Sequence, residues 1–142
     1  MDPMSKRSFL AAGLAVGVTA GPLGAMAQGS DRKLGYAILG LGYYATQIIM
    51  PRFAECEHSR IAALVSGTPE KLKRFGDQYG VPESARYSYE TFDRIIDNPD
   101  VDIVYVVTPN SLHRVFTERA AKAGKHVMCE KPMATSSADC EA

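Results

Sequence analysis

The chain has 142 residues, with 16 basic and 16 acidic side chains and a formal net charge of zero. This length suits one ordinary domain, and a neutral chain without a long basic run gives no electrostatic reason to expect a nucleic acid as partner. Apolar residues make up 46% of the sequence, which is enough for a hydrophobic core, and no low-complexity tract indicates disorder.

The first residues carry the features of an export signal. Lys6 and Arg7 form a short basic region, residues 9–20 are apolar or small, and Ala25-Met26-Ala27 fits a small-x-small cleavage site. The apolar run is too short to cross a bilayer comfortably. We therefore expect a signal peptide over residues 1–27 and no membrane segment after its removal.

The signal also indicates the export route. Ser5-Lys6-Arg7-Ser8-Phe9-Leu10 resembles a twin-arginine motif with lysine in place of the first arginine, which leaves the route for unfolded chains open as well. We expect a periplasmic protein, exported by the twin-arginine route, with a linker over residues 28–33. The three cysteines have no metal-like spacing, so we expect no metal site; a disulfide between two of them stays open, and Cys129 is expected to be a buried thiol.

From residue 34 onward, apolar runs alternate with helical patterns, which is typical of a parallel sheet with crossover helices. Strands are predicted at 34–39, 60–65, 86–87, 102–107 and 126–129, and helices at 43–55, 69–79, 89–96, 112–123 and from 135 onward. Right-handed crossovers then give the strand order 3-2-1-4-5. The fold class is α/β, with helices on both faces of the sheet.

Individual residues also indicate where these helices begin, where they bend and which side faces the core. Pro51 should kink or break the helix at 43–55, while Thr68 and Ser111 should cap the helices that follow them. Between 89 and 96, an apolar stripe is expected to face the core through Tyr89, Phe92, Ile95 and Ile96.

The turn after the first strand fits a dinucleotide-binding fingerprint. Gly40-Leu41-Gly42-Tyr43-Tyr44-Ala45 matches G-x-G-x-x-A between a strand and a helix. Gly40 permits the tight turn, Gly42 leaves room for a pyrophosphate, and Ala45 allows close packing of helix on strand. The helix start then offers unpaired N–H groups to the phosphates. A glycine-rich turn without a ligand is the alternative.

The end of the second strand indicates which dinucleotide is bound. An NAD site usually places an acid there, whereas this chain has Ser66-Gly67-Thr68, with Lys71 one helical turn later. Hydroxyls and an ammonium suit a 2′-phosphate that a carboxylate would repel. NADP is therefore the expected cofactor, although Lys71 could equally be a solvated surface lysine.

Two further polar segments follow the last two strands, at the edge where open α/β sheets bind ligands. The fourth strand leads into Thr108-Pro109-Asn110-Ser111-Leu112-His113, and the fifth into Glu130-Lys131-Pro132. Glu130 and Lys131 could be a plain surface pair, but Pro132 restricts the backbone beside the amine.

Together with the fingerprint, these segments resemble the family of glucose–fructose oxidoreductases, inositol dehydrogenases and their relatives, over residues 34–142. The resemblance implies a Rossmann-type domain and a hydride-transferring enzyme that acts on a small sugar. It also implies that Lys131 is the catalytic residue beside the nicotinamide, with Glu130 near the adjoining ribose, and that Asn110 and His113 line the pocket. A helix-start residue contacting solvent is the alternative for His113, and His58 and His126 are expected to be structural or surface residues. The cofactor-binding residues expected on both grounds are Gly40, Gly42, Tyr43, Tyr44, Ala45, Ser66, Gly67, Lys71, Thr108, Pro109, Asn110, His113, Glu130 and Lys131.

The family resemblance also implies what lies beyond this chain. In the family, a second domain supplies the substrate pocket, the subunit interface and the general acid or base. We therefore expect the cofactor-binding domain over 34–142 to be incomplete at its C-terminus and inactive by itself, and the parent enzyme to be a homo-oligomer.

Three functions remain to be distinguished. The leading one is aldose oxidation coupled to ketose reduction with NADP retained. An exported NAD-dependent glycosidase of the same fold is the second, and a non-catalytic dinucleotide-binding module is the third. Lys131 argues against the third, because a sensor has no use for a charged group at the hydride site.

Overall fold

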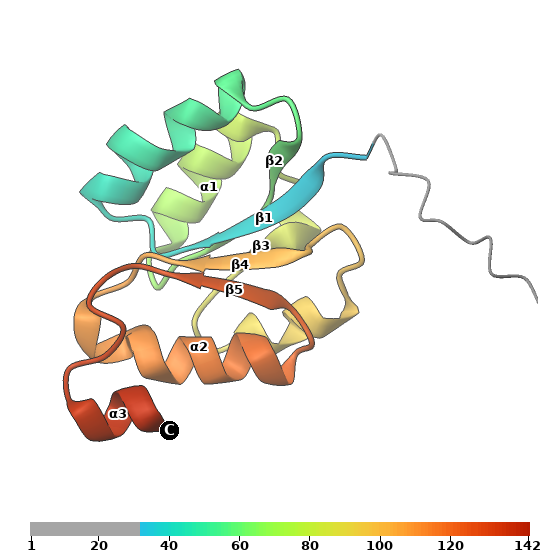
Figure 1. Ribbon diagram of the computed structural model, residues 1–142. Coiled ribbons are helices and arrows are strands. Elements are labelled where there is room, and N and C mark those ends of the chain that lie inside the picture. Colours follow the sequence, from blue (N-terminus) through green and yellow to red (C-terminus); the bar gives the residue numbers. More distant parts are fainter. Residues whose placement is uncertain (1–31) are drawn as a thin grey trace, which may run out of the picture. The chain divides into compact units, whose positions relative to one another are not determined.

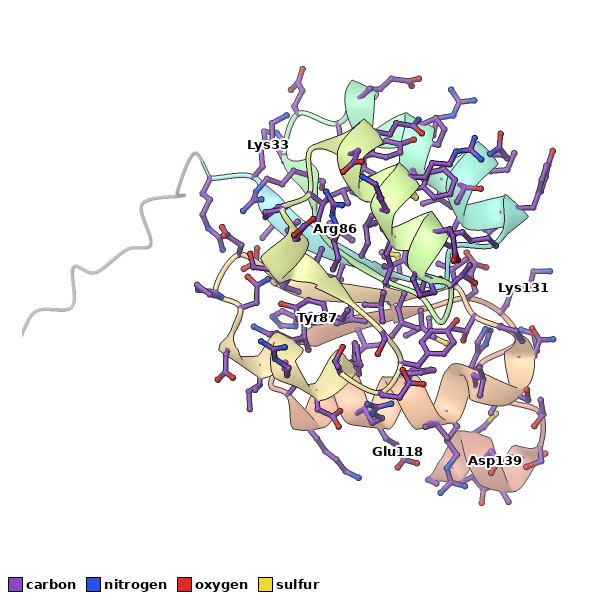
Figure 2. The ribbon with its side chains drawn as sticks, turned by 180° about the vertical axis from the view of Figure 1, so that it is seen from behind. Lys33, Arg86, Tyr87, Glu118, Lys131 and Asp139 are labelled. Carbon is purple, nitrogen blue, oxygen red and sulfur yellow. The ribbon has the colours of Figure 1, made fainter. Side chains whose placement is uncertain are left out.

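Five parallel strands form one sheet in the order β3-β2-β1-β4-β5, as predicted (Figure 1). The computed structural model describes residues 32–142, so the expected signal peptide and the linker up to residue 31 lie outside the described residues. All strands run from an end near Lys33 toward an end near Lys131 (Figure 2). The strands are β1 (Leu34–Leu39), β2 (Ser59–Val65), β3 (Arg86–Tyr87), β4 (Ile103–Val106) and β5 (His126–Cys129).

Helical segments cover both faces of the sheet. The crossovers around β1, β2 and β3 lie on one face, and those that lead to β4 and β5 lie on the other (Figure 1). The first group is η1 (Tyr44–Ile49), η2 (Met50–Glu55) and α1 (Pro69–Tyr79); the second is η4 (Phe92–Asp97) and α2 (His113–Lys122). Three short segments complete the chain: η3 (Glu83–Ala85), η5 (Asn110–Leu112) and α3 (Ser137–Glu141).

The core is built on the central strands. Ile38, Leu64 and Val104 are fully buried, since helices cover these strands on both faces. β5 lies at the edge of the sheet and alternates between exposed and half-buried residues, so that Met128 stays 45% exposed.

Pro51 reshapes the first crossover in the predicted way. The helix begins as the π-helical η1, in which the Met50 N–H donates to the Ala45 carbonyl, and continues as the 3₁₀-helical η2. Proline has no N–H to donate and its ring clashes with the carbonyl four residues earlier in an α-helix. Widening the turn before Pro51 avoids that clash.

Two helix starts differ from the prediction. Ser111 does not cap α2, because a 3₁₀ turn from Pro109 to Leu112 leads into the helix and leaves Leu112 in helical backbone conformation. Thr68 does occupy the N-cap position of α1, but its side chain makes no capping hydrogen bond.

The expected apolar stripe is also only partly correct. Phe92 and Ile95 are fully buried, whereas Ile96 is 56% exposed. The segment is a 3₁₀-helix, in which residues three apart lie on the same side. Ile96 therefore turns away from the core that Phe92 and Ile95 share.

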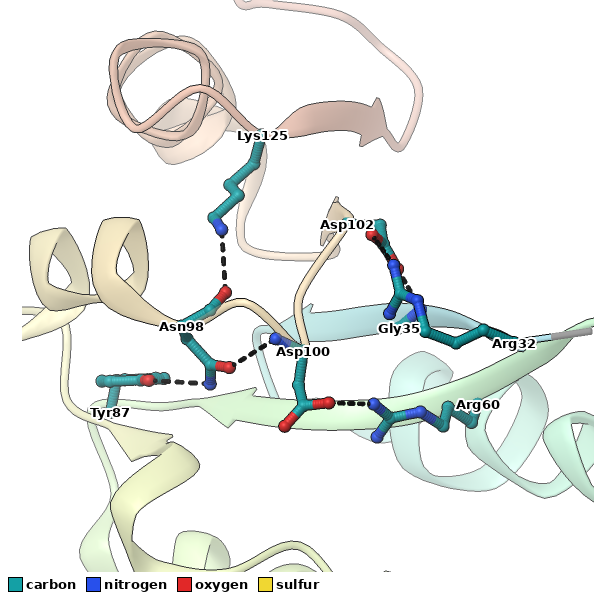
Figure 3. Close-up of polar contacts among 8 residues, drawn as sticks. All are labelled: Arg32, Gly35, Arg60, Tyr87, Asn98, Asp100, Asp102 and Lys125. Carbon is teal, nitrogen blue, oxygen red and sulfur yellow. Dashed lines mark hydrogen bonds and ion pairs between the residues drawn. The ribbon is translucent and has the colours of Figure 1, made fainter. Parts of the chain in front are cut away.

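A polar network joins the loops at the amino ends of the strands (Figure 3). Asp102 accepts hydrogen bonds from Arg32 (2.5 Å) and from the Gly35 N–H (2.7 Å), and thereby fastens the start of β1 to the start of β4. Asp100 pairs with Arg60 at 2.6 Å, which adds β2 to the network. This end of the sheet is therefore held together by side chains.

Cys56, Cys129 and Cys140 are all free, and Cys129 is half-buried rather than buried. His58 and His126 lie on the surface, as expected. Over residues 32–142, no helix combines the length and the apolar character needed to cross a membrane.

The Asp102 network gives a pH-dependent prediction. Partial burial raises the pKa of Asp102, but hydrogen bonds from Arg32 and the Gly35 N–H outweigh it and lower the pKa below its usual range. Because the pKa of Asp102 is lower in the folded state, its carboxylate stabilises the fold fully at pH values above the unfolded-state pKa of about 4. This stabilisation is lost as the pH falls through the folded-state pKa. Asp102→Asn should therefore cost about 1–2 kcal/mol at pH 7.

Urea unfolding at pH 7 and near pH 3 measures this difference, which should shrink at the lower pH. Asp93→Asn is the matched control, because Asp93 is 71% exposed and pairs with Arg119 at the surface. A cost for Asp102→Asn that stays constant across this pH range would contradict the assignment.

Candidate cofactor site

The glycine turn after β1 has the geometry that the fingerprint requires. Gly40 adopts a φ of 104°, and a Cβ there would lie 2.5 Å from the Val107 carbonyl oxygen, so only glycine fits. At Gly42, by contrast, no described atom outside its two chain neighbours lies within 4 Å of where a Cβ would be. Ala45 is fully buried against the sheet. Gly40 and Ala45 therefore have the backbone geometry and the burial that were predicted, and space is left open over Gly42.

The helix that starts after this turn presents free backbone donors. The N–H and the Oγ1 of Thr46 both donate to the Gly42 carbonyl, at 3.0 and 2.9 Å. The amides of residues 43–45 precede this first intrahelical bond and have no partner within the helix. They carry the partial positive charge of the helix start, which favours an anion in front of the turn.

A cavity of about 460 Å³ lies in front of this turn, at the carboxyl end of the sheet. It brings together the glycine turn, the end of β2 and the end of β4. The predicted residues that line it are Gly40, Gly42, Tyr43, Tyr44, Ser66, Gly67, Lys71, Thr108 and Pro109.

Lys71 reaches this cavity from α1. Its Nζ donates to the Leu41 carbonyl at 3.0 Å, within the glycine turn. Lys71 is exposed, as the interpretation as a surface lysine expects, but this contact holds its Nζ at the glycine turn. Ser66 is 4% exposed, and its Oγ accepts from the Thr68 N–H at 3.1 Å, which leaves the hydroxyl proton available to a ligand.

Sequence reasoning did not assign Tyr89 to this site. Its ring lies 3.2 Å from where a Cβ on Gly67 would be, and it lines the same cavity. Burial raises the pKa of Tyr89, so its hydroxyl stays neutral. Tyr89 had been expected only as part of an apolar helical stripe, and no local motif marks its role.

A second cavity of about 300 Å³ adjoins the first and shares Tyr44, Val107 and Thr108 with it. Its other lining residues are Asn110, His113, Glu130 and Lys131, all of which were predicted. Lys131 is exposed, and no residue in the described part of the chain pairs with its ammonium. Figure 2 shows it at the carboxyl end of the sheet.

His113 is 1% exposed, which excludes the interpretation that it contacts solvent. Its Nδ1 lies 2.7 Å from the Pro132 carbonyl oxygen, and its Nε2 lies 2.9 Å from that of Thr108. A neutral imidazole carries one N–H and can donate to only one of these two carbonyls, so the ring bonds one loop and packs against the other, between the loop after β4 and the loop after β5. Its main contribution to the cavity is to hold these two loops together.

Tyr105 also belongs to this site, and the sequence analysis missed it. Its hydroxyl donates to the Glu130 carboxylate. Burial, together with this carboxylate, raises the pKa of Tyr105 above its usual value. In the sequence Tyr105 stands in the middle of an apolar strand, where an aromatic residue indicates core packing, so no local signal could have identified it.

The residues present fit a dinucleotide. Thr108 Oγ1 is buried at both cavities and has no hydrogen-bond partner among residues 32–142, so it lacks the partner that a buried hydroxyl normally has. The open space over Gly42 lies among donors: the helix-start amides, Ser66 and Lys71. Such a set suits phosphates in the first cavity. The described residues contain no cluster of three or more groups able to hold a metal ion.

Known proteins resemble this chain strongly. An aldose–aldose oxidoreductase from Caulobacter crescentus, solved with glycerol, is 87% identical, with a TM-score of 0.76 over 78% of this chain and 33% of that one. A 3-ketoreductase from Actinomadura kijaniata, solved with NADP, is 28% identical, with a TM-score of 0.68 over 78% of this chain and 34% of that one.

Curated proteins with similar sequences include a further sugar oxidoreductase. A D-xylose 1-dehydrogenase [NADP(+)] of Haloarcula marismortui is 34% identical over 104 residues, which are 73% of this chain and 29% of that protein. The chain spans about a third of the length of such relatives. A family model described as "Oxidoreductase family, NAD-binding Rossmann fold" matches residues 34–142. The chain therefore belongs to this oxidoreductase family, and residues 34–142 form its Rossmann domain.

Proposed function

We propose that residues 34–142 are the cofactor-binding part of an NADP-dependent sugar oxidoreductase that couples oxidation of an aldose to reduction of a second sugar. The observation that carries this proposal is the second cavity, in which Glu130 and Lys131 lie beside the cavity over the glycine turn. The 87% identity to an aldose–aldose oxidoreductase supports a sugar as substrate. Because the chain spans about a third of its relatives, the activity belongs to the whole protein.

The first cavity would bind the cofactor's phosphates. The amides of Tyr43 and Tyr44 would hold the pyrophosphate, since both residues line the cavity and lie at a helix start. Ser66 and Lys71 would hold a 2′-phosphate: the serine offers a hydroxyl proton, and the lysine offers an ammonium that the Leu41 carbonyl keeps over the turn. The absence of an acid at the end of β2 supports NADP rather than NAD.

The second cavity would hold the reacting centre. Bound NADP supplies a hydride acceptor for one sugar and a hydride donor for the other. The Lys131 ammonium would stabilise negative charge that develops on the sugar oxygen as its proton leaves. His113 would keep the loops that carry Asn110 and Lys131 in register, because its ring spans both.

The test is a two-sugar assay of the full-length protein without added cofactor. Glucose with fructose, or with a second aldose, should give an oxidised and a reduced sugar in equal amounts, and the better acceptor identifies ketose or aldose as the second substrate. Lys131→Ala should retain cofactor binding and lose about 10²–10³-fold in turnover, as when a charge-stabilising donor is removed.

Lys122→Ala is the matched control, since Lys122 is 79% exposed on α2 and far from the cavity lining. Cleavage of an aryl glycoside in place of sugar oxidation would favour the glycosidase alternative. An unchanged rate in Lys131→Ala would contradict the proposed mechanism.

Cofactor preference is tested by titrating the protein with NADP and with NAD. Lys71→Ala should weaken NADP binding about tenfold, the size of one charge-assisted hydrogen bond, and leave NAD binding unchanged. Lys73→Ala is the control, because Lys73 lies on the same helix but pairs with Asp77 at the surface. Equal affinities of the wild type for NADP and NAD would overturn the assignment of Ser66 and Lys71.

We also propose that the protein is exported to the periplasm by the twin-arginine route. The basic pair Lys6 and Arg7, the apolar run after it and the cleavage site at Ala25-Met26-Ala27 support this. Replacing Lys6 and Arg7 by glutamine should leave the uncleaved protein in the cytoplasmic fraction. Cell fractionation that finds the wild-type protein there as well would refute export.

A further inference from the structure

A buried tyrosine hydroxyl donates to Glu130, the only acidic side chain among residues 32–142 that lines the second cavity. Tyr105 is 8% exposed and lies on β4, where it pairs in register with Met128 of β5. Glu130 follows β5 directly, so the tyrosine reaches it across one strand. The Tyr105 hydroxyl donates to Oε1 of Glu130.

The hydrogen bond between Tyr105 and Glu130 is held in place from both sides. Burial and the neighbouring carboxylate raise the pKa of Tyr105, so the hydroxyl keeps its proton and remains a donor. The backbone N–H of Glu130 also donates to the Val106 carbonyl at 3.0 Å. Glu130 is therefore anchored at both its backbone and its carboxylate, and its half-buried side chain faces the cavity.

We propose that Tyr105 is a positioning residue that holds the Glu130 carboxylate against the second cavity, so that the site binds the oxidised cofactor more tightly than the reduced one. The inference rests on the proposed function, because it takes this cavity as the place of the nicotinamide ring. The oxidised ring carries a positive charge and the reduced ring is neutral. A fixed carboxylate therefore stabilises only the oxidised form.

The other charged or titratable groups at this cavity are Lys131 and His113. The Lys131 ammonium opposes the effect of Glu130, but it is present in both the wild type and Tyr105→Phe, so a difference between these two proteins reports the Glu130 contact. The His113 ring nitrogens both face backbone carbonyls. Glu130 is the charge that the fold itself holds in place, and Tyr105 is the side chain that holds it.

The experiment compares the affinities for oxidised and reduced NADP in wild type and Tyr105→Phe, by calorimetry and by the fluorescence of the reduced cofactor. Tyr105→Phe should weaken binding of the oxidised form about fivefold, the size of one hydrogen bond, and leave the reduced form unchanged. A merely structural role would weaken both forms equally. Equal losses, or none, would overturn the inference.

Tyr87→Phe is the matched control. Tyr87 is 5% exposed, and its hydroxyl also takes part in a side-chain hydrogen bond, accepting from Asn98 Nδ2 at 3.1 Å, but it lies on β3 outside both cofactor cavities. The ratio of the affinities for oxidised and reduced NADP should be the same in Tyr87→Phe as in the wild type. This comparison separates the loss of a buried hydroxyl from the loss of the Glu130 contact.

Glu130→Gln tests the same idea without removing the tyrosine. It should abolish the preference for the oxidised form, and adding Tyr105→Phe to it should change the ratio no further, since Tyr105 acts through Glu130. A further change in the ratio of affinities in the double variant would contradict the conclusion that Tyr105 acts through Glu130. All titrations use protein from which retained cofactor has been removed. If this wild type binds neither form, the proposed function fails; if it binds both forms without preference, only this inference fails.

Discussion

A row of backbone hydrogen bonds across the carboxyl edge of the sheet fixes three of the turns that carry the candidate site. The Gly40 N–H donates to the Val65 carbonyl at 2.9 Å, and the Val107 N–H donates to the Leu39 carbonyl at 2.8 Å. The Glu130 N–H continues the row on the far side. Each donor follows the end of its strand, so the turns that leave β1, β4 and β5 are held in register before any side chain contributes. The two cavities adjoin because these three turns do.

The elements that carry the fold could be predicted because their signals are local. Apolar runs gave all five strands to within a residue or so, and the alternation of strands and helices gave their order. The incorrect predictions concern positions where the neighbouring residues, and not the residue itself, determine the local structure. Ser111 has a side chain that can cap a helix, but it lies within the 3₁₀ turn that leads from Pro109 into α2. Ile96 would lie on the apolar face of an α-helix, but the segment is a 3₁₀-helix, which places it on another side.

The candidate site shows the same division. Glycines, Lys71 and the Glu130-Lys131 pair stand in motifs, and the structure brings them to two adjoining cavities. Tyr105 and Tyr89 stand in no motif. Tyr105 meets Glu130 only through the pairing of β4 with β5, and Tyr89 meets the cavity only because it packs beside Gly67. Contacts that depend on strand register or on packing between distant segments leave no mark in a single sequence.

Choice of cofactor and control of the reacting centre rest on different parts of the fold. Lys71 is an exposed side chain on α1, so it can change at little cost to the core. Glu130, in contrast, depends on Tyr105, which is part of the packed sheet. Relatives can therefore exchange one dinucleotide for another by changing an exposed residue, whereas a change at the Glu130 carboxylate must also be accommodated by the core beneath it.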